Sequence, residues 1–454
     1  MQRLVTTRLA PIALAFAFAS TAFAQEAGPG DLVAGPKNAE PAEEHERLAV
    51  RAAKILTLAR EGAAFLDNAT MLVEDGKIVS LGKSSELEVP DGYEVLDVGD
   101  RWIMPGLVEL HSHVGAPTPF SPNDINDTVY LTNPGLRASP SVQAGNVRLR
   151  RGLAGGVTTI LFIPGSGSNI GGQGVLLKIG HGTYEEAELR NPGSMKLAQA
   201  GNPERWTVGV TRTFMNWNLR NTIQRGAAYA RRWEAFERGE SSEEPERDIQ
   251  LEIFRALRMG DAQVSTHTQF GQVVMMTVLM VAIEAKLPVF IDHGSFGGFL
   301  YGDYAEEHGV AAILGPRLIA TTGFYAMWDS LDNDGRILGI AAEYQKRGHT
   351  AIGFNTDCVD GDGSLGTPPQ EELSLQAAMS VRYGLKNVNL ESLRGLTIVP
   401  AETVGLGERI GSLEPGKDAD FLVLDGDVAD PRTTVERVYT DGELVYDAEE
   451  ERVW

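Results

Sequence analysis

The stretch "PGLVELHSHVG", Pro105–Gly115, places two of the chain's eight histidines directly after a hydrophobic run. On a β-strand, residues two apart project to the same face, so His111 and His113 would converge. Two imidazoles at the C-terminal end of a barrel strand suit a borderline metal such as zinc. Taken alone, the pair fits equally well an accidental His-x-His in a loop, so the rest of the chain has to decide.

Three further hydrophobic runs end on side chains that can bind a metal. His267 ends "AQVSTH", His293 ends "PVFIDH" and Asp357 ends "AIGFNTD". Any one of them is explained by a buried, hydrogen-bonded side chain. Three such endings together favour a shared polar site at the C-terminal ends of the strands.

Between Gly106 and about Gly405, short apolar runs alternate with helical stretches, which indicates a parallel sheet. Eight candidate strands in one long run favour a closed (β/α)8 TIM barrel, with an open doubly wound sheet as the alternative. No Gly-x-Gly-x-x-Gly motif follows the first strand, which argues against a dinucleotide site. The candidate strands are "GLVELHSH", "GVTTILFIP", "GVLLKIG", "SMKLA", "AQVSTHTQ", "PVFIDHG", "VAAILGP" and "TAIGFNTD".

Both ends of the chain show a different pattern. Residues 46–104 contain short apolar runs broken by turn signals such as Asp75-Gly76, and residues 405–454 return to the same pattern. These runs are too closely spaced for βαβ units, so we expect a small antiparallel sheet. A split β-sandwich domain built from both chain ends would flank a barrel at residues 105–404.

The first residues are typical of a secretory signal. Arg3 and Arg8 precede an apolar core, and Ala22-Phe23-Ala24 forms a small-x-small cleavage site. The apolar core is short for a membrane anchor, so we expect cleavage after Ala24 and a periplasmic or secreted protein. Residues 25–45 are rich in Pro, Gly, Ala and acid, which predicts a mobile mature N-terminus.

Composition limits the partners. The formal net charge of -22 argues against nucleic acid, whose phosphates would be repelled. No other run is long and apolar enough for stable membrane insertion. The single cysteine, Cys358, cannot form an intrachain disulfide. The oligomeric state stays open, with a homo-oligomer among the options.

The chain resembles the amidohydrolase superfamily of metal-dependent hydrolases, and most of all its imidazolonepropionase-like exported members. The likeness rests on "IMPGLVELHSHVG", "GGVTTILFIPG" and "GSLEPGKDADFLVLDGD", of which the last is the most specific. The resemblance implies a (β/α)8 barrel with a β-sandwich from both ends. It also implies a divalent metal centre, with two Zn²⁺ ions in binuclear members.

The resemblance assigns roles to individual residues. His111 and His113 would bind the more buried ion, and His267 and His293 the more exposed one. The second ion, or His293 if only one ion binds, would polarise the scissile carbonyl. Asp357 would bind the first ion and accept a proton from the attacking water. A carboxylated lysine would bridge the ions; Lys196 in "GSMKLAQ" matches the family position, and Lys178 in "GVLLKIG" is the competitor.

The implied reaction is hydrolysis of a C–N bond in a small-molecule substrate, an amide, peptide-like or cyclic amide, by metal-activated water. Deamination and ester hydrolysis on the same scaffold are alternatives, and a catalytically inactive binding homologue is a third. Arg212 could bind a substrate carboxylate, and Tyr301 and Tyr304 could line the pocket, although each is also an ordinary surface or loop residue. The stretch "GSGSNIGGQG", Gly165–Gly174, lacks the Lys-Ser/Thr ending of a phosphate loop, so we expect a flexible loop at the barrel mouth.

Overall fold

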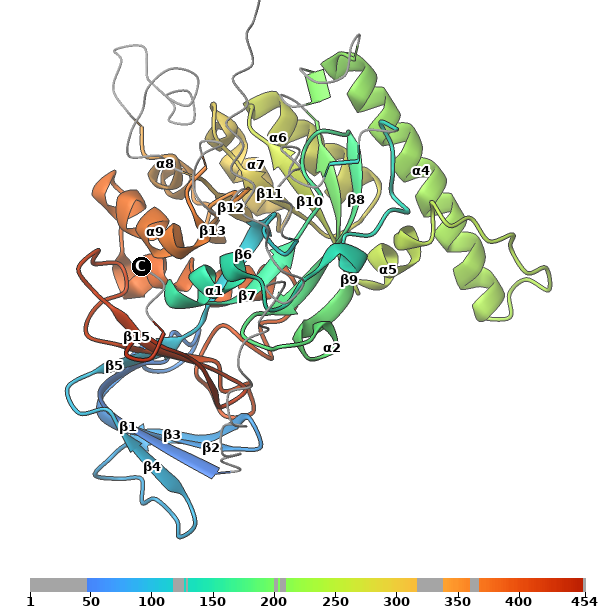
Figure 1. Ribbon diagram of the computed structural model, residues 1–454. Helices are drawn as coiled ribbons and strands as arrows, with labels where there is room; N and C mark the ends of the chain where they lie inside the picture. The colour runs from blue at the N-terminus through green and yellow to red at the C-terminus, as the bar shows by residue number, and fades with distance from the viewer. Residues whose placement is uncertain are drawn as a thin grey trace, which may run out of the picture. The chain divides into compact units, whose positions relative to one another are not determined.

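The computed structural model describes residues 47–116, 126–127, 130–199, 203–204, 210–316, 338–359 and 367–451 (Figure 1). The expected signal peptide (1–24) and mobile N-terminal segment (25–45) lie outside these residues. Among the helices that the structure describes, none is long and apolar enough to cross a bilayer.

Strands from both ends of the chain form one eight-stranded sheet. Its order is β16-β15-β14-β5-β1-β2-β3, and β4 pairs with β1. Buried apolar side chains from both chain ends, including Met71, Ile103 and Phe421, pack into one hydrophobic cluster. The strands are β1 (Arg47–Leu56), β2 (Phe65–Glu74), β3 (Lys77–Lys83), β4 (Glu94–Asp97), β5 (Trp102–Pro105), β14 (Phe421–Leu424), β15 (Val435–Thr440) and β16 (Glu443–Asp447).

The expected small domain from both chain ends is therefore present, but its strands are not all antiparallel. β1 pairs antiparallel with β2 and parallel with β4 and β5. The Asp75-Gly76 turn joins β2 and β3 as the sequence predicts. Both of its residues have positive φ, 46° and 74°, which suits a tight hairpin turn.

A second eight-stranded sheet forms the barrel, in the order β13-β12-β11-β10-β9-β8-β7-β6. It is closed by a bridge between Ser112 and Cys358, where the amide of His113 also donates to the carbonyl of Cys358 at 2.9 Å. The eight strands are β6 (Leu107–Ser112), β7 (Val157–Phe162), β8 (Ile170–Lys178), β9 (Glu188–Ala198), β10 (Gln263–Thr268), β11 (Val289–His293), β12 (Ala312–Leu314) and β13 (Ile352–Phe354). The predicted TIM-like barrel is confirmed.

One strand differs from the expected parallel arrangement. β8 runs antiparallel to both neighbours, β7 and β9. A parallel crossover needs about a dozen residues or more, and only residues 163–169 join β7 to β8, so the chain has to turn back. The glycine-rich stretch Gly165–Gly174 is therefore half connection and half strand, and it is buried rather than a flexible exposed loop.

Helices cover the outside of the barrel (Figure 1). The helix predicted from "TIQRGAAYARRWEAFERG" begins earlier, because the Thr211 hydroxyl caps it by accepting the amide of Phe214. The helices are α1 (Val147–Ala154), α2 (Tyr184–Ala187), α4 (Arg212–Glu237), α5 (Ile253–Met259), α6 (Gly271–Thr277) with the π-helical η2 (Val278–Glu284), α7 (Gly302–Glu307), α8 (Ile340–Lys346), α9 (Leu373–Arg382), α10 (Glu391–Arg394) and α11 (Ile398–Thr403). Shorter 3₁₀ turns are η1 (Ser139–Ser141), η3 (Gly298–Tyr301), η5 (Gln370–Glu372) and η6 (Val388–Leu390).

Candidate functional site

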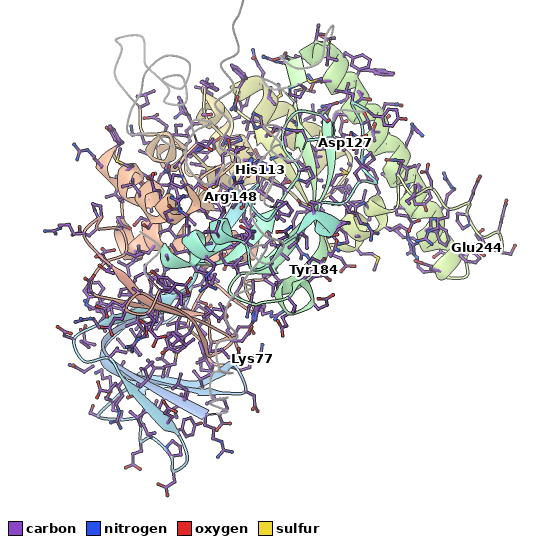
Figure 2. All side chains as sticks on the ribbon, in the orientation of Figure 1. Lys77, His113, Asp127, Arg148, Tyr184 and Glu244 are labelled. Atoms are coloured by element: carbon purple, nitrogen blue, oxygen red, sulfur yellow. The ribbon has the colours of Figure 1, made fainter. Side chains whose placement is uncertain are left out.

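Six side chains meet where the parallel barrel strands end, around the position of His113 in Figure 2. They come from the ends of five strands, and each is buried, with at most 9% of the residue exposed. The six are His111, His113, Lys196, His267, His293 and Asp357. Because parallel strands of a barrel end on one rim, residues far apart in the sequence converge there.

The first group consists of His111, His113 and Asp357. Oδ1 of Asp357 lies 3.1 Å from Nε2 of His111 and 3.4 Å from Nε2 of His113. The three potential ligand atoms lie within 4.8 Å of one another, so one metal ion could contact all three.

The second group is His267 with His293. Nδ1 of His267 lies 2.9 Å from Nε2 of His293, and the ring centroids are 4.4 Å apart. The hydroxyl of Ser166, in the glycine-rich connection, also lies 2.9 Å from Nδ1 of His267. The sequence carried no signal for Ser166 beyond the unusual glycine content around it.

Lys196 lies beside both groups. Its Nζ is 3.2 Å from Nε2 of His111, and the rings of His111 and His293 are only 4.6 Å apart between centroids. Two neighbouring ion positions sharing one lysine are thus compatible with this arrangement.

Hydrogen bonds fix how two of the imidazoles face the site. Nδ1 of His113 lies 2.8 Å from the carbonyl oxygen of Ile163, and Nδ1 of His293 lies 2.7 Å from that of Gly315. A carbonyl can only accept, so Nδ1 carries the proton in each ring. The lone pair of Nε2 is then turned towards the site, which is the form that a metal requires.

Two of the six residues adopt a strained backbone. His293 has φ 72° and Asp357 has φ 48°, in the left-handed region that side chains other than glycine rarely adopt. Such strain costs about 1–3 kcal/mol per residue and collects at functional sites. His293 is the last residue of β11 and Asp357 lies three residues after β13, so the left-handed backbone sets where both side chains point as the chain leaves these strands.

The electrostatics of the site favour a bound cation. Burial lowers the pKa of His113, His267 and His293, the last to about 4, so these rings are neutral. Burial works against ionised Asp357, but the neighbouring histidines, above all His111, hold the pKa of its carboxyl well below the usual range. Neutral imidazoles beside an ionised carboxylate form the donor set of a divalent metal site.

His111 differs from the other three rings. Burial and Lys196 lower its pKa, whereas Asp292 and Asp357 raise it further, to about 9 overall. Two carboxylates around one ring therefore provide the negative charge that a divalent cation would neutralise. The buried Nε2 of His267 also has no hydrogen-bond partner among the described residues, so the residues present fit a metal ion.

Two buried carboxylates near His111 were missed by sequence reasoning. Glu109 accepts the amide of His111 at 2.9 Å and the amide and hydroxyl of Thr356 at 2.8 and 2.7 Å, so it ties β6 to the end of β13. Asp292 lies 3.4 Å from Nδ1 of His111. In the sequence both are single acidic residues inside apolar strand runs, a pattern that indicates a buried charge with a specific partner.

Lys178, the competitor for the bridging position, is not at this site. Its Nζ contacts Asp418 at 2.6 Å, Asp420 at 3.0 Å and Asp441 at 2.5 Å. All three carboxylates belong to the C-terminal segment. One of them, Asp418, also contacts Lys77, the first residue of β3, which is labelled in Figure 2. Because β8 runs antiparallel, its last residue points to the opposite end of the barrel, so Lys178 as the bridge is wrong.

The candidate substrate-binding residues have other partners. The Arg212 guanidinium lies over the ring of Phe270 at 4.7 Å and contacts Glu204 at 3.3 Å. Tyr301 and Tyr304 both pack, partly buried, against the hydrophobic core, and Tyr304 meets the ring of His308 edge-on. The aromatic partner of Arg212, Phe270, lies three residues after the site histidine His267.

Comparisons with known proteins point to one group. The amidohydrolase family model matches residues 296–445. The amidohydrolase tasK of Hapsidospora irregularis is 26% identical over 83% of this chain, which spans only 40% of that longer protein. The imidazolonepropionase of Sphingopyxis alaskensis is 24% identical and covers 85% of this chain and 93% of its own length. An amidohydrolase structure from Thermotoga maritima has a TM-score of 0.74 and 27% identity, over 88% of this chain and 100% of the other.

Proposed function

We propose that this chain, which belongs to the amidohydrolase superfamily and is a hydrolase of C–N bonds, works with two zinc ions on an amide, peptide-like or cyclic amide bond. The observation that carries the proposal is the convergence of four histidines, one lysine and one aspartate on a single barrel rim. Imidazole and carboxylate donors in this number suit zinc.

The first ion would be held by His111, His113 and Asp357, and the second by His267 and His293. When bound, the ions lower the pKa of water towards neutrality and polarise the scissile carbonyl. If only one ion binds, His293 would have to be protonated at Nε2 to polarise that carbonyl, because its Nδ1 already donates to Gly315 and the neutral ring turns only a lone pair to the site.

Lys196 would join the two ion positions as a carbamate. Its amine is wholly buried, and a neutral amine can add carbon dioxide with loss of one proton. The resulting carbamate has one negative charge and two oxygens. The position of Nζ, 3.2 Å from Nε2 of His111, supports this role.

Asp357 would move the proton. Its carboxyl is ionised and faces both His111 and His113, where the attacking water has to lie. It would take a proton from the water and deliver it to the leaving nitrogen, which would otherwise depart as a poor anionic leaving group. The Glu109 contacts to Thr356, the residue before Asp357, would hold this carboxylate in place.

Arg212 supports a substrate that carries a carboxylate, such as a dipeptide or an N-acyl amino acid. Its guanidinium lies against Phe270, which in turn stacks on Phe296 at 5.2 Å. These rings follow His267 and His293 by three residues each. A carboxylate bound by Arg212 beside these rings would orient the scissile bond, although Glu204 would have to release the guanidinium.

The experiment is a hydrolysis screen of the zinc-loaded protein against dipeptides, N-acyl amino acids, their carboxyl-amidated forms and cyclic amides. We expect turnover of a carboxylate-bearing amide, with a much lower kcat/KM for its amidated form. Arg212→Ala should remove that preference by raising KM. Turnover of esters or release of ammonia from a purine-like ring, with no amide hydrolysis, would replace the proposed reaction with an alternative.

The proposal extends to export. The basic start, apolar core and Ala22-Phe23-Ala24 support a signal peptide cleaved after Ala24 and a periplasmic or secreted enzyme.

A further inference from the structure

The carboxylate of Asp292 is wholly buried beneath the site, on β11 immediately before His293. Its Oδ1 lies 3.4 Å from Nδ1 of His111, and its Oδ2 lies 3.6 Å from Nζ of Lys196. Asp292 therefore contacts two of the six site residues, and it approaches the ring of His111 on the side opposite Asp357.

The backbone explains how Asp292 and His293 can both face the barrel interior. In a regular strand, successive side chains point to opposite faces. His293 leaves the regular strand conformation with φ 72°, so its ring can turn back to the side on which Asp292 already points.

A charge in this position carries a cost that the fold alone does not explain. Burying a carboxylate is unfavourable unless it is paired, and even a buried ion pair is often no more stabilising than apolar side chains that replace the whole pair. The basic groups beside Asp292 are His111 and Lys196, both members of the site. The contacts of this carboxylate thus favour a role at the site over a role in core packing.

The other imidazoles show what such a partner does. Nδ1 of His113 and Nδ1 of His293 are each held by a backbone carbonyl. His111 has Asp292 at the equivalent atom, while its Nε2 faces Asp357. A carboxylate there fixes the tautomer and orients the ring. It also makes the lone pair of Nε2 more basic, and so a stronger metal ligand, than a carbonyl partner would.

We propose that Asp292 is a positioning residue that holds His111 by Nδ1 and Lys196 by Nζ, so that both present their ligand atoms to the metal centre. This inference rests on the proposed metal-dependent function. It assigns Asp292 no contact with substrate or metal.

The test measures zinc affinity rather than activity. Apo protein is titrated with Zn²⁺ against a chromophoric chelator, for the wild type, Asp292→Asn and Asp292→Leu. The matched control is Asp303→Asn, which removes the same charge from an exposed position on α7. We expect about a 10- to 100-fold weaker zinc Kd for both Asp292 variants and no change for Asp303→Asn.

Thermal unfolding of each apo protein separates positioning from folding. We expect the apo Tm of Asp292→Asn to stay close to that of the wild type, since the amide keeps the size of the carboxylate and the buried amine and imidazole beside it can give up a proton. Zinc Kd values within twofold of the wild type in both Asp292 variants would overturn the inference, as would an affinity loss accompanied by an equal loss of apo stability. A wild type that binds no zinc would instead contradict the proposed function, so the two failures are distinguishable.

Discussion

Lys196 and Lys178 lie on neighbouring antiparallel strands and point to opposite ends of the barrel. Lys196, near the end of β9, pairs in register with Gly172 near the start of β8, whereas Lys178 is the last residue of β8 and pairs with Thr159. At about 3.3 Å per residue, the six positions from Gly172 to Lys178 separate them by about 20 Å. Of two buried lysines with similar sequence context, Lys196 therefore belongs to the histidine site and Lys178 to the ion network with the C-terminal segment.

The two lysines should give opposite phenotypes. Lys196→Ala should lose most bound metal and activity, with an apo Tm close to that of the wild type and partial rescue of activity by a short carboxylic acid. Lys178→Met should keep the metal stoichiometry but lose about 3–5 kcal/mol of stability, since it leaves Asp418, Asp420 and Asp441 without their shared cation. Metal analysis and urea unfolding of both variants check this pair, and loss of metal from Lys178→Met alone would reverse the assignment.

Asp357→Asn should abolish turnover while the fold survives. Asparagine keeps the size of the side chain but cannot accept a proton at neutral pH, so we expect kcat to fall by at least about 10²-fold, with unchanged circular dichroism. The adjacent Cys358→Ser is the matched control, because the contact that Cys358 makes with His113 uses its backbone carbonyl. Near wild-type kcat in Asp357→Asn would remove it as proton carrier, and a folded but inactive Cys358→Ser would point to thiol chemistry.

The ion network that joins the barrel to the C-terminal segment should make stability depend on pH. Asp418 is buried and accepts from Lys178 at 2.6 Å, from Arg409 at 2.7 Å and from Lys77. Burial alone would raise the pKa of Asp418, but these cations lower it further, to below its ordinary value.

The sign follows from that lowered pKa. Ionised Asp418 stabilises the fold above about pH 4, and this contribution is lost as the pH falls through the folded-state pKa. The pKa of Asp420 in the same network is shifted in the opposite direction, since burial raises it. The pKa of Asp441, which also contacts His181, is lowered to about 2.

Asp418→Asn should therefore cost about 3 kcal/mol at pH 7 and progressively less below pH 4, where the wild-type carboxyl itself becomes protonated. Urea unfolding at a series of pH values measures the difference. Asp91→Asn, at an exposed turn, should show almost no difference at any pH. A cost for Asp418→Asn that stays constant from pH 7 to pH 3 would exclude ionised Asp418 as its source.

Exported protein should begin at Gln25. Amino-terminal sequencing of material from the periplasm or medium checks this, and Ala24→Arg should block processing because the cleavage site needs a small residue. Recovery of a membrane-bound form that retains Met1 would show an anchor instead.

The sequence was sufficient for the barrel and for bringing together four histidines and Asp357, because apolar strand runs and polar strand ends are local features. Lys196 was assigned only by the family resemblance. It could not give the direction of β8, since a continuously buried run reads the same both ways and only the short 163–169 connection carries the information. Asp292 is visible in the sequence as an acid inside an apolar strand, but its place beside His111 could not be predicted, because the left-handed conformation of His293 does not follow from the residue types. The partners of Lys178 lie more than 200 residues away in sequence, at a separation of 240 for Asp418, so no local pattern could reveal them.

Metal content tests the central claim most directly. The purified protein, dialysed against metal-free buffer and analysed by inductively coupled plasma mass spectrometry, should retain about two zinc ions per chain. His111→Ala and His267→Ala should each lower that number, and removal of the metal with a chelator should abolish hydrolysis until zinc is returned. A wild type with one ion would contradict the binuclear centre bridged by Lys196, and a wild type that hydrolyses its substrate without any bound metal would contradict the account as a whole.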